Sequence, residues 1–547
     1  MSANNTDYKT PLHKLVPFFK KSRDKWKEKY MAVKEDSKRL INRLRRLEES
    51  KNKWKKEALE LRKENKRLRD KVEEPSEPDG ESEEQKNPIT ERTVSFPADL
   101  HVKPFAHQYP LIVIELFTRL VLDAAAGLRT SENIMSVLNR TMNCSLPVPS
   151  WYTGRIWLMK LGYWKLTAPK TIADDWAWIV DFTIQSGTTK VFVIFGIRLK
   201  DIPAGQILSH EDIEPIDLVP LEKANGDIVY TKLEEAVAKT GVPRVIISDA
   251  GSDIKSGIKK FCAAHVETSY IYDGKNKIAT LLKSRLEKDE RWGEFCEFTG
   301  RLNKTLRQTP FAHLTPTSFR IKARYMNLDS RIRWAESMLG ILKSEPGFEH
   351  FDFPDLEISG SVSTDADTVK SELYKKAGQL IDYTSAVDEW SELLNICIYI
   401  ENTIRTCGYI RNIHYDVNHD IRKEFGELKY TANKDFLENL LLFIEEQQSE
   451  CKPGECLPGS TEVLESVLGK QKYIEGEQSK SGFTGLVLGI AAIVSKTTSE
   501  IIRSAMEMTP VKTVLEWQRN KLGPTLQARR MEAFGSARSG TKTGSVS

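Results

Sequence analysis

The sequence predicts a mixed α+β or α/β protein, in which one small buried sheet is joined to a large all-helical region and to a long helix. Three observations lead to this prediction. Two apolar runs, at 176–182 and 190–197, flank the turn-forming residues 185–188, as in a β-hairpin. Apolar residues recur at every seventh position between residues 19 and 72. From about residue 275 to 449 the hydrophobic pattern is almost wholly helical.

Residues 19–72 carry the heptad repeat of a coiled coil, after a short tail at 1–18. The row assigned to position d consists of Phe19, Trp26, Val33, Leu40, Leu47, Trp54, Leu61 and Leu68. The row three residues earlier, assigned to position a, is mixed and contains Asn65, which favours a fixed register and few strands. We therefore expect a long helix that forms a homodimer, although the pattern does not exclude a different partner.

Charge is unevenly distributed along the chain. Residues 1–75 hold 24 Lys and Arg against 13 Asp and Glu, a net charge of +11 that leaves −7 for the rest. A basic arm on a near-neutral body favours nucleic acid or another polyanion as a partner, the alternative being a merely solvated helix. Residues 73–104 are acidic at first, contain Pro, Ser and Gly, and have no hydrophobic pattern, so we expect a flexible linker.

The cysteine content and the hydropathy of the sequence indicate in which cellular compartment the protein is expected. Seven scattered cysteines, an odd number, are typical of a reduced intracellular protein. Cys451 and Cys456 do not have a zinc-ligand spacing, and no second pair follows them. We find no signal peptide, and the longest apolar run, 485–494, is too short to span a bilayer. The sequence thus predicts no membrane association.

The region 105–168 is predicted to be helical, with helices at 111–126, 131–141 and 151–161. Residues Thr130 and Ser131 would cap the second helix, Ser150 would cap the third, and Gly162 would end it.

The third of these helices places Arg155 and Lys160 on what we interpret as a polar face. A helix, a short turn and a basic helix are typical of a helix-turn-helix DNA-binding motif. A helical bundle that braces the next domain is the alternative.

Two carboxylates are expected to converge at the centre of the sheet. Asp181 lies in the first strand of the hairpin, and Asp249 ends a second short buried strand at 245–249. A buried carboxylate loses several kcal/mol of hydration unless a cation or a hydrogen-bond donor meets it. If the two strands are parallel neighbours, both carboxylates meet at one position, where oxygen ligands suit Mg²⁺.

The elements around these strands have a recognisable order. A third strand is predicted at 213–220, followed by a helix at 231–240, the Asp249 strand, a helix at 254–264 and a strand at 268–273. This succession of three strands, helix, strand, helix and strand resembles an RNase H-like core. The first part of that core would span 169–276.

An all-helical insertion is then expected at 277–457, interrupted by an acidic loop at 345–367, and a second part of the core at 458–534. The insertion helices are predicted at 278–286, 292–302, 332–342, 386–405 and 435–446, and further apolar helix at 483–507. The Gly/Ser/Thr-rich tail 535–547 is expected to be disordered.

A predicted helix from Ser460 supplies a third carboxylate, Glu465, with Lys472 two turns further along the same face. Together with Asp181 and Asp249 this set resembles the D-D-E transposases of the RNase H-like superfamily. The spacing of Glu465 and Lys472 is similar to that of many bacterial insertion-sequence transposases.

Two further stretches carry the resemblance. Residues 458–466 resemble the segment that holds the catalytic glutamate of hAT transposases, which also have a large helical insertion before it. Residues 273–292 are similar to a segment of insertion-sequence transposases that often have His where this chain has Asn276. The tyrosine and arginine partners of the hairpin-forming reaction are absent, because Pro458 and Thr461 stand at their places.

By this resemblance, Asp181, Asp249 and Glu465 would be catalytic and would bind two Mg²⁺ ions, or Mn²⁺, to cut and join transposon ends. Asp273 and Glu462 are the runner-up ligands, although Gly469 and not a base lies seven residues beyond Glu462. The DNA contacts would come from Arg155, Lys160, Lys470 and Lys472.

The resemblance thus implies a DNA transposase of a bacterial insertion sequence, located in the cytoplasm near the nucleoid, with transposon-end and target DNA as partners. Two alternatives remain open. One is a retired transposase that binds DNA or acts as a scaffold without catalysis. The other is an RNase H-fold nuclease that acts on branched DNA.

Overall fold

A computed structural model describes residues 101–539 except 143–145, 187–188, 204, 250, 318–327, 345–355, 359–360, 364–365, 477–483 and 525. The chain divides into two units, Met1–Glu91 and Arg92–Ser547, and every described residue belongs to the second. The tail 1–18, the coiled coil 19–72 and nearly all of the linker 73–104 therefore lie outside the described residues, and these predictions remain untested.

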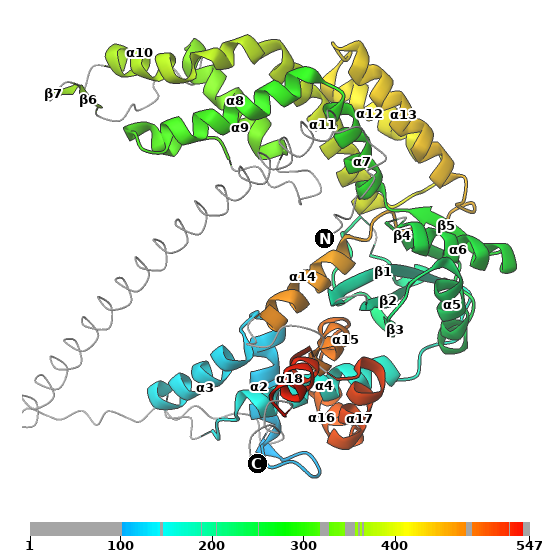
Figure 1. The fold of residues 1–547 in the computed structure, drawn as a ribbon. Helices are drawn as coiled ribbons and strands as arrows, with labels where there is room; N and C mark the ends of the chain where they lie inside the picture. Colours follow the sequence, from blue (N-terminus) through cyan, green and yellow to red (C-terminus); the bar gives the residue numbers. More distant parts are fainter. Residues whose placement is uncertain are drawn as a thin grey trace, which may run out of the picture. The chain divides into compact units, whose positions relative to one another are not determined.

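A five-stranded mixed sheet forms the centre of the described unit, with strand order β3-β2-β1-β4-β5 (Figure 1). Its strands are β1 (Trp176–Ser186), β2 (Thr189–Arg198), β3 (Glu214–Leu221), β4 (Val245–Ser248) and β5 (Ser269–Tyr272). Strands β1, β2 and β3 are antiparallel neighbours, whereas β4 runs parallel to both β1 and β5. With α5 (Gly226–Thr240) and α6 (Ser252–Ala264), the order along the chain is the predicted one and is consistent with an RNase H-like core.

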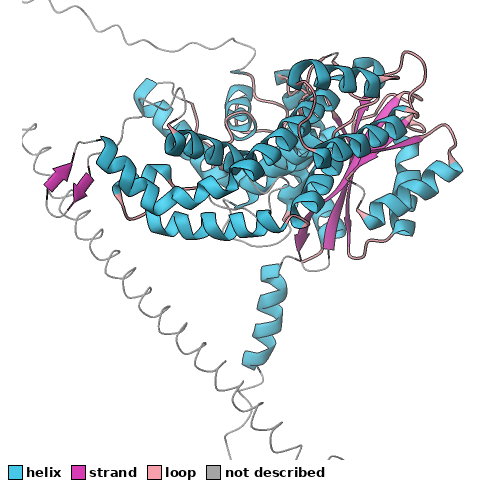
Figure 2. Ribbon diagram, turned by 90° about the horizontal axis from the view of Figure 1, so that it is seen from above, coloured by secondary structure: helices cyan, strands magenta, loops and turns pink. Residues whose placement is uncertain are grey.

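The central strands are apolar on both faces because helices cover both sides of the sheet (Figure 2). Trp178 and Val180 of β1 pack with Leu233 of α5 and Phe261 of α6. Residues of the opposite face, such as Ile179, belong to the main core of the unit. This double burial explains why neither hairpin strand shows the simple alternation of a half-exposed strand.

A helical bundle packs against the sheet beside β3, and α4 runs through its middle. The bundle contains α2 (Leu111–Leu122), α3 (Leu128–Met142), α4 (Trp151–Thr167), the 3-10 helix η5 (Gly485–Leu488), α15 (Gly489–Ile493), α16 (Ser499–Met508) and α17 (Val511–Leu522). The apolar helix predicted at 483–507 is thus broken into three pieces. This arrangement is the bracing bundle that the sequence left as the alternative to a helix-turn-helix.

Two of the helix ends predicted here are wrong and one is confirmed. Ser150 caps α4 by accepting a hydrogen bond from the Thr153 main-chain N–H. Gly162 does not end α4, which continues to Thr167, because the glycine instead admits the backbone of Leu488. Ser131 is not a cap, since α3 begins before it and its hydroxyl donates to the Gly127 carbonyl oxygen.

Between β5 and the second part of the core, the chain is mainly helical, as predicted. The helices are α7 (Gly274–Glu287), α8 (Glu290–Leu306), η3 (Pro310–Leu314), α9 (Leu328–Lys343), α10 (Ala366–Ala377), η4 (Gly378–Tyr383), α11 (Thr384–Cys407), α12 (Ile413–Phe425) and α13 (Thr431–Gln448). A small hairpin, β6 (Leu356–Ile358) and β7 (Ser361–Ser363), lies in the predicted acidic loop.

Two helices follow the insertion outside the bundle. Helix α14 (Glu462–Gly476) carries the predicted glutamate and packs against β1. Helix α18 (Leu526–Ser539) extends into the tail predicted to be disordered, whose residues from 540 onward lie outside the described part.

Candidate active site

Asp181 and Asp249 come together at the centre of the sheet. Strand β1 pairs in parallel with β4, and the last paired residues are Ile179 and Ile247. Two residues further along each chain, the same register places Asp181 beside Asp249. Both side chains line one open cavity of about 290 Å³. The expected convergence of the two carboxylates is therefore observed.

Local backbone donors orient each of these carboxylates. Oδ1 of Asp181 accepts a hydrogen bond from the Phe182 main-chain N–H at 2.6 Å. Oδ1 of Asp249 accepts one from the Gly251 N–H at 3.1 Å, which closes a turn between β4 and α6. Both side chains are half-buried, so their oxygens are partly desolvated while the cavity keeps them accessible.

Asn276 fixes the backbone at Asp249. Its Nδ2 donates to the main-chain oxygen of Asp249 at 2.8 Å, although 27 residues separate the two in sequence. Its own main-chain N–H donates to Oδ1 of Asp273 at 2.8 Å, which caps α7. No local pattern around Asn276 indicates this role, because the contact joins two elements that only the folded protein brings together.

Asp273, a runner-up ligand, is a structural residue. It is completely buried, and its Oδ2 accepts hydrogen bonds from both the main-chain N–H and the hydroxyl of Thr461. The neighbouring Gly274 N–H donates to the Gly459 oxygen at 2.9 Å. Asp273 thus joins the end of β5 to the start of α14, and its oxygens do not face a metal site.

Glu462, the other runner-up, is neutralised by two cations. Its carboxylate lies 3.1 Å from Lys275 Nζ and 2.6 Å from Arg405 Nε, and Lys275 also contacts Glu401 at 3.2 Å. These ion pairs connect α14 with α7 and α11. Glu462 does not line the cavity that contains Asp181 and Asp249, and its role as a metal ligand stays a prediction.

Glu465, the predicted third ligand, is half-buried on α14, the helix that packs against β1. It does not line the cavity that contains Asp181 and Asp249. Within the described ranges, no group of three or more His, Cys, Asp or Glu side chains is arranged to hold a metal ion. The structure thus brings together two of the three predicted ligands and places the third on an adjacent element.

Two residues of the cavity that sequence reasoning missed are Lys190 and Thr183. Lys190 is at the start of β2, and its ammonium lies 5.4 Å from the centre of the Phe182 ring. The lysine ammonium can bind a phosphate group, and the two carboxylates can bind a divalent metal ion. No sequence motif identifies Lys190 as a site residue, because only the pairing of β1 and β2 in the hairpin places it beside Asp181.

The predicted polar face of α4 does not exist, because that helix is buried on nearly every side. Lys160 Nζ donates to the Met506 oxygen at 2.5 Å and contacts His107 Nε2 at 2.8 Å, and burial lowers the pKa of Lys160 to about 8. Burial likewise lowers the pKa of Arg155. Neither cation faces solvent, so the predicted DNA-binding face formed by Arg155 and Lys160 is wrong.

The two lysines predicted on α14 differ in environment. Lys472 is exposed. Lys470 is half-buried, and burial lowers its pKa, while the carboxylates of Asp123 and Glu211 act in the opposite direction. Lys472 is therefore the one whose charge is fully presented to solvent.

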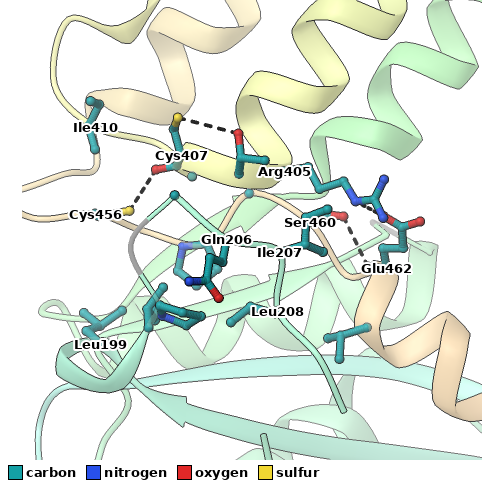
Figure 3. A pocket seen from close by; sticks show the side chains of 18 residues that line it. Leu199, Gln206, Ile207, Leu208, Arg405, Cys407, Ile410, Cys456, Ser460 and Glu462 are labelled. Carbon is teal, nitrogen blue, oxygen red and sulfur yellow. Dashed lines mark hydrogen bonds and ion pairs between the residues drawn. The ribbon is translucent and has the colours of Figure 1, made fainter. Parts of the chain in front are cut away.

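A second cavity, of about 320 Å³, lies between the loop after β2, the end of α11 and the start of α14 (Figure 3). Its walls are mainly apolar, with Ile207 and Ile410 among them, and the Arg405–Glu462 ion pair lies at its border. Cys456 Sγ donates to the Cys407 oxygen at 2.9 Å. This cavity lies where the core meets the insertion. Glu462 is the one carboxylate among the described residues that line it, so it does not resemble the Asp181 site.

No known protein family and no curated protein matches this sequence. Among solved structures, the chain is similar to one from a Drosophila P element transposase strand transfer complex, with a TM-score of 0.31 and 13% identity. The similarity covers 72% of this chain and 92% of that chain. A likeness of this size does not establish a shared family. In the described part of the chain, no helix is both long and apolar enough to cross a membrane.

Proposed function

We propose that this chain is a metal-dependent DNA transposase of a bacterial insertion sequence, which cuts and joins DNA strands. The observation that carries the proposal is the convergence of Asp181 and Asp249 from parallel neighbouring strands into one cavity. Paired carboxylates at this place in a mixed five-stranded sheet are suited to phosphodiester chemistry with divalent metal ions.

The donor set fits Mg²⁺, with Mn²⁺ as a substitute. Mg²⁺ in phosphoryl-transfer sites is commonly bound by one or two carboxylates and completed by water and substrate phosphates. Asp181 and Asp249 would supply the carboxylates. Glu465 is proposed as the third ligand because its helix packs against the strand that carries Asp181. When bound, two such ions activate the attacking hydroxyl and stabilise the leaving oxygen.

The chain's own residues have distinct roles in this proposal. The two aspartates would hold the metal ions, and Asn276 holds the Asp249 backbone in place. Lys190 meets a phosphate at the same cavity, and Lys472 contacts the DNA backbone further along α14. The proposed partners are transposon-end and target DNA, together with a second copy bound through residues 19–72. The proposed location is the cytoplasm of a prokaryotic cell.

A second candidate is a transposase-derived protein that binds DNA without cutting it. The position of Glu465 outside the carboxylate cavity favours this candidate. Both candidates bind DNA, so they differ only in metal-dependent cleavage.

The test is cleavage of a duplex that carries the DNA flanking the gene on both sides, with Mg²⁺ or Mn²⁺. Asp181→Asn and Asp249→Asn should each reduce cleavage by at least about a hundredfold, because each removes a charged metal ligand. DNA affinity should change by less than about threefold. Glu465→Gln should be as inactive as these two if Glu465 is the third ligand.

Asp253→Asn is the matched control, since Asp253 is a half-buried carboxylate in the first turn of α6 that does not line the cavity. It should retain wild-type cleavage. Wild-type protein that binds the duplex but leaves it intact with both metals would favour the second candidate. Wild-type protein that does not bind DNA would refute both.

A further inference from the structure

Charge in the insertion is divided between its two halves. Residues 274–343 contain 15 Lys and Arg against 7 Asp and Glu, whereas residues 344–457 contain 10 against 23. The first half is therefore net positive by 8 and the second net negative by 13. A polyanion approaching the insertion is attracted to the first half and repelled by the second.

Three of these fifteen cations follow one another at the carboxyl-terminal end of α8, with no acidic residue between them. Arg301, Lys304 and Arg307 are all exposed and follow one another at three-residue intervals, so they share one broad side of the helix. Among the residues that the structure describes, no carboxylate forms an ion pair with any of the three. The amino-terminal half of the same helix is different, since its exposed side chains include Glu294 and Glu297.

The surrounding elements hold this end of α8 rigidly. Arg331 of α9 donates to the hydroxyl of Thr299 at 2.9 Å. Asn303 donates to the Pro316 oxygen at 2.6 Å, and Trp334 Nε1 donates to the Leu314 oxygen at 2.9 Å. Because α8, η3 and α9 are joined by these bonds, the three cations are presented from a fixed surface.

We propose that Arg301, Lys304 and Arg307 form a phosphate-binding surface for duplex DNA, an inference that rests on the proposed function. The three residues span about 9 Å along the helix axis at 1.5 Å per residue. Successive phosphates of one DNA strand are spaced about 3.4 Å along the duplex axis, so the surface covers two or three of them. These contacts carry no base readout and serve to position the DNA along the insertion.

Two simpler roles compete with this one. Cations in the last turns of a helix interact favourably with its dipole and so stabilise the helix. An acidic protein surface would also be attracted to the same side chains. Neither role gives a salt dependence of DNA binding that changes with these residues.

The experiment compares full-length wild type with the triple variant Arg301→Gln, Lys304→Gln, Arg307→Gln in binding to a duplex of the flanking DNA between 50 and 300 mM salt. Removing three phosphate contacts should lower the slope of log affinity against log salt by about 3. At 0.1 M salt the affinity should fall roughly a hundredfold.

The control is Lys423→Gln, Lys429→Gln, Lys434→Gln, which removes the same charge from three exposed lysines in the negative half of the insertion. Its slope should stay within about 1 of wild type. Equal slopes and affinities for wild type and the α8 variant would overturn this inference and leave the proposed function intact. The same follows if both variants weaken DNA binding equally. No DNA binding by wild type would instead refute the proposed function.

Discussion

Glu475 lies near the end of α14 and close to Arg155 of α4. Burial raises the pKa of Glu475 to about 7, while a hydrogen bond from the Thr484 hydroxyl and the charge of Arg155 act in the opposite direction. The hydrogen bond is long, at 3.4 Å. The carboxyl group is therefore held mainly in its neutral form below neutral pH.

The sign of the resulting pH dependence follows from linkage. The folded protein binds this proton more tightly than the unfolded chain, so the stabilisation is complete below about pH 4.5 and is lost as the pH rises to about 7. Glu475→Gln should be close to wild type at pH 4.5 and more stable by about 2–3 kcal/mol at pH 8. Urea unfolding at the two pH values measures this difference.

Glu438→Gln, at an exposed carboxylate of α13, is the control and should not change the pH dependence. If Glu475→Gln alters stability equally at both pH values, Glu475 does not titrate in the predicted range.

Single residues were predictable where a local pattern identified them. Asp181 and Asp249 stand in or after apolar strand sequences, so a buried or half-buried carboxylate was evident in each. Lys190 and Asn276 could not be found in this way, since their roles arise from contacts across strands and helices. Arg155 and Lys160 were misassigned because α4 is covered on nearly every side, so its basic residues have no exposed face.

At the scale of elements, Gly162 allows α4 to pack closely against η5 and α15. A Cβ at this position would lie 1.9 Å from the Leu488 carbonyl oxygen, a backbone atom that cannot move away without displacing η5. The absence of a side chain therefore permits the contact between two helices of the bundle.

Gly162→Ala should destabilise the protein by about 3 kcal/mol, because overpacking here must move backbone. Gly300→Ala is the matched control, since Gly300 lies within α8 and nothing lies within 4 Å of its added Cβ. That change should stabilise by up to about 1 kcal/mol through helix propensity. Urea midpoints of the two variants test both statements, and a Gly162→Ala protein as stable as wild type would contradict the packing argument.

The sheet was the most predictable set of elements, because apolar runs bounded by turn residues determine both strand positions and order. Helix ends were less predictable. From the sequence alone, Gly162 predicts the end of a helix. In the fold it lies inside α4 and allows the backbone of Leu488 to pack closely against that helix. The partner that gives it this role, Leu488, is more than 300 residues away.

At the scale of the whole molecule, the predicted helical insertion is present, whereas Glu465, predicted to meet the two aspartates, does not line their cavity. Strand register brings Asp181 and Asp249 together over a few paired residues. Glu465 lies 216 residues beyond Asp249, and its position depends instead on where α14 packs. No local sequence pattern determines a position over such a distance. The ion pairs of Glu462 and the hydrogen bonds of Asp273 determine where α14 lies instead.

Residues 1–75, with a net charge of +11 and a heptad repeat over 19–72, should contribute both assembly and DNA affinity. Deleting them should lower the assembly from a dimer to a monomer in sedimentation velocity and reduce the salt slope of DNA binding by about 0.9 per lost phosphate contact.

The double variant Leu40→Ser, Leu47→Ser separates the two contributions, because it breaks the d row and keeps the charge. It should sediment as a monomer, yet keep a steeper salt slope than the deletion. If wild type and the deletion sediment identically, pairing through these residues is wrong.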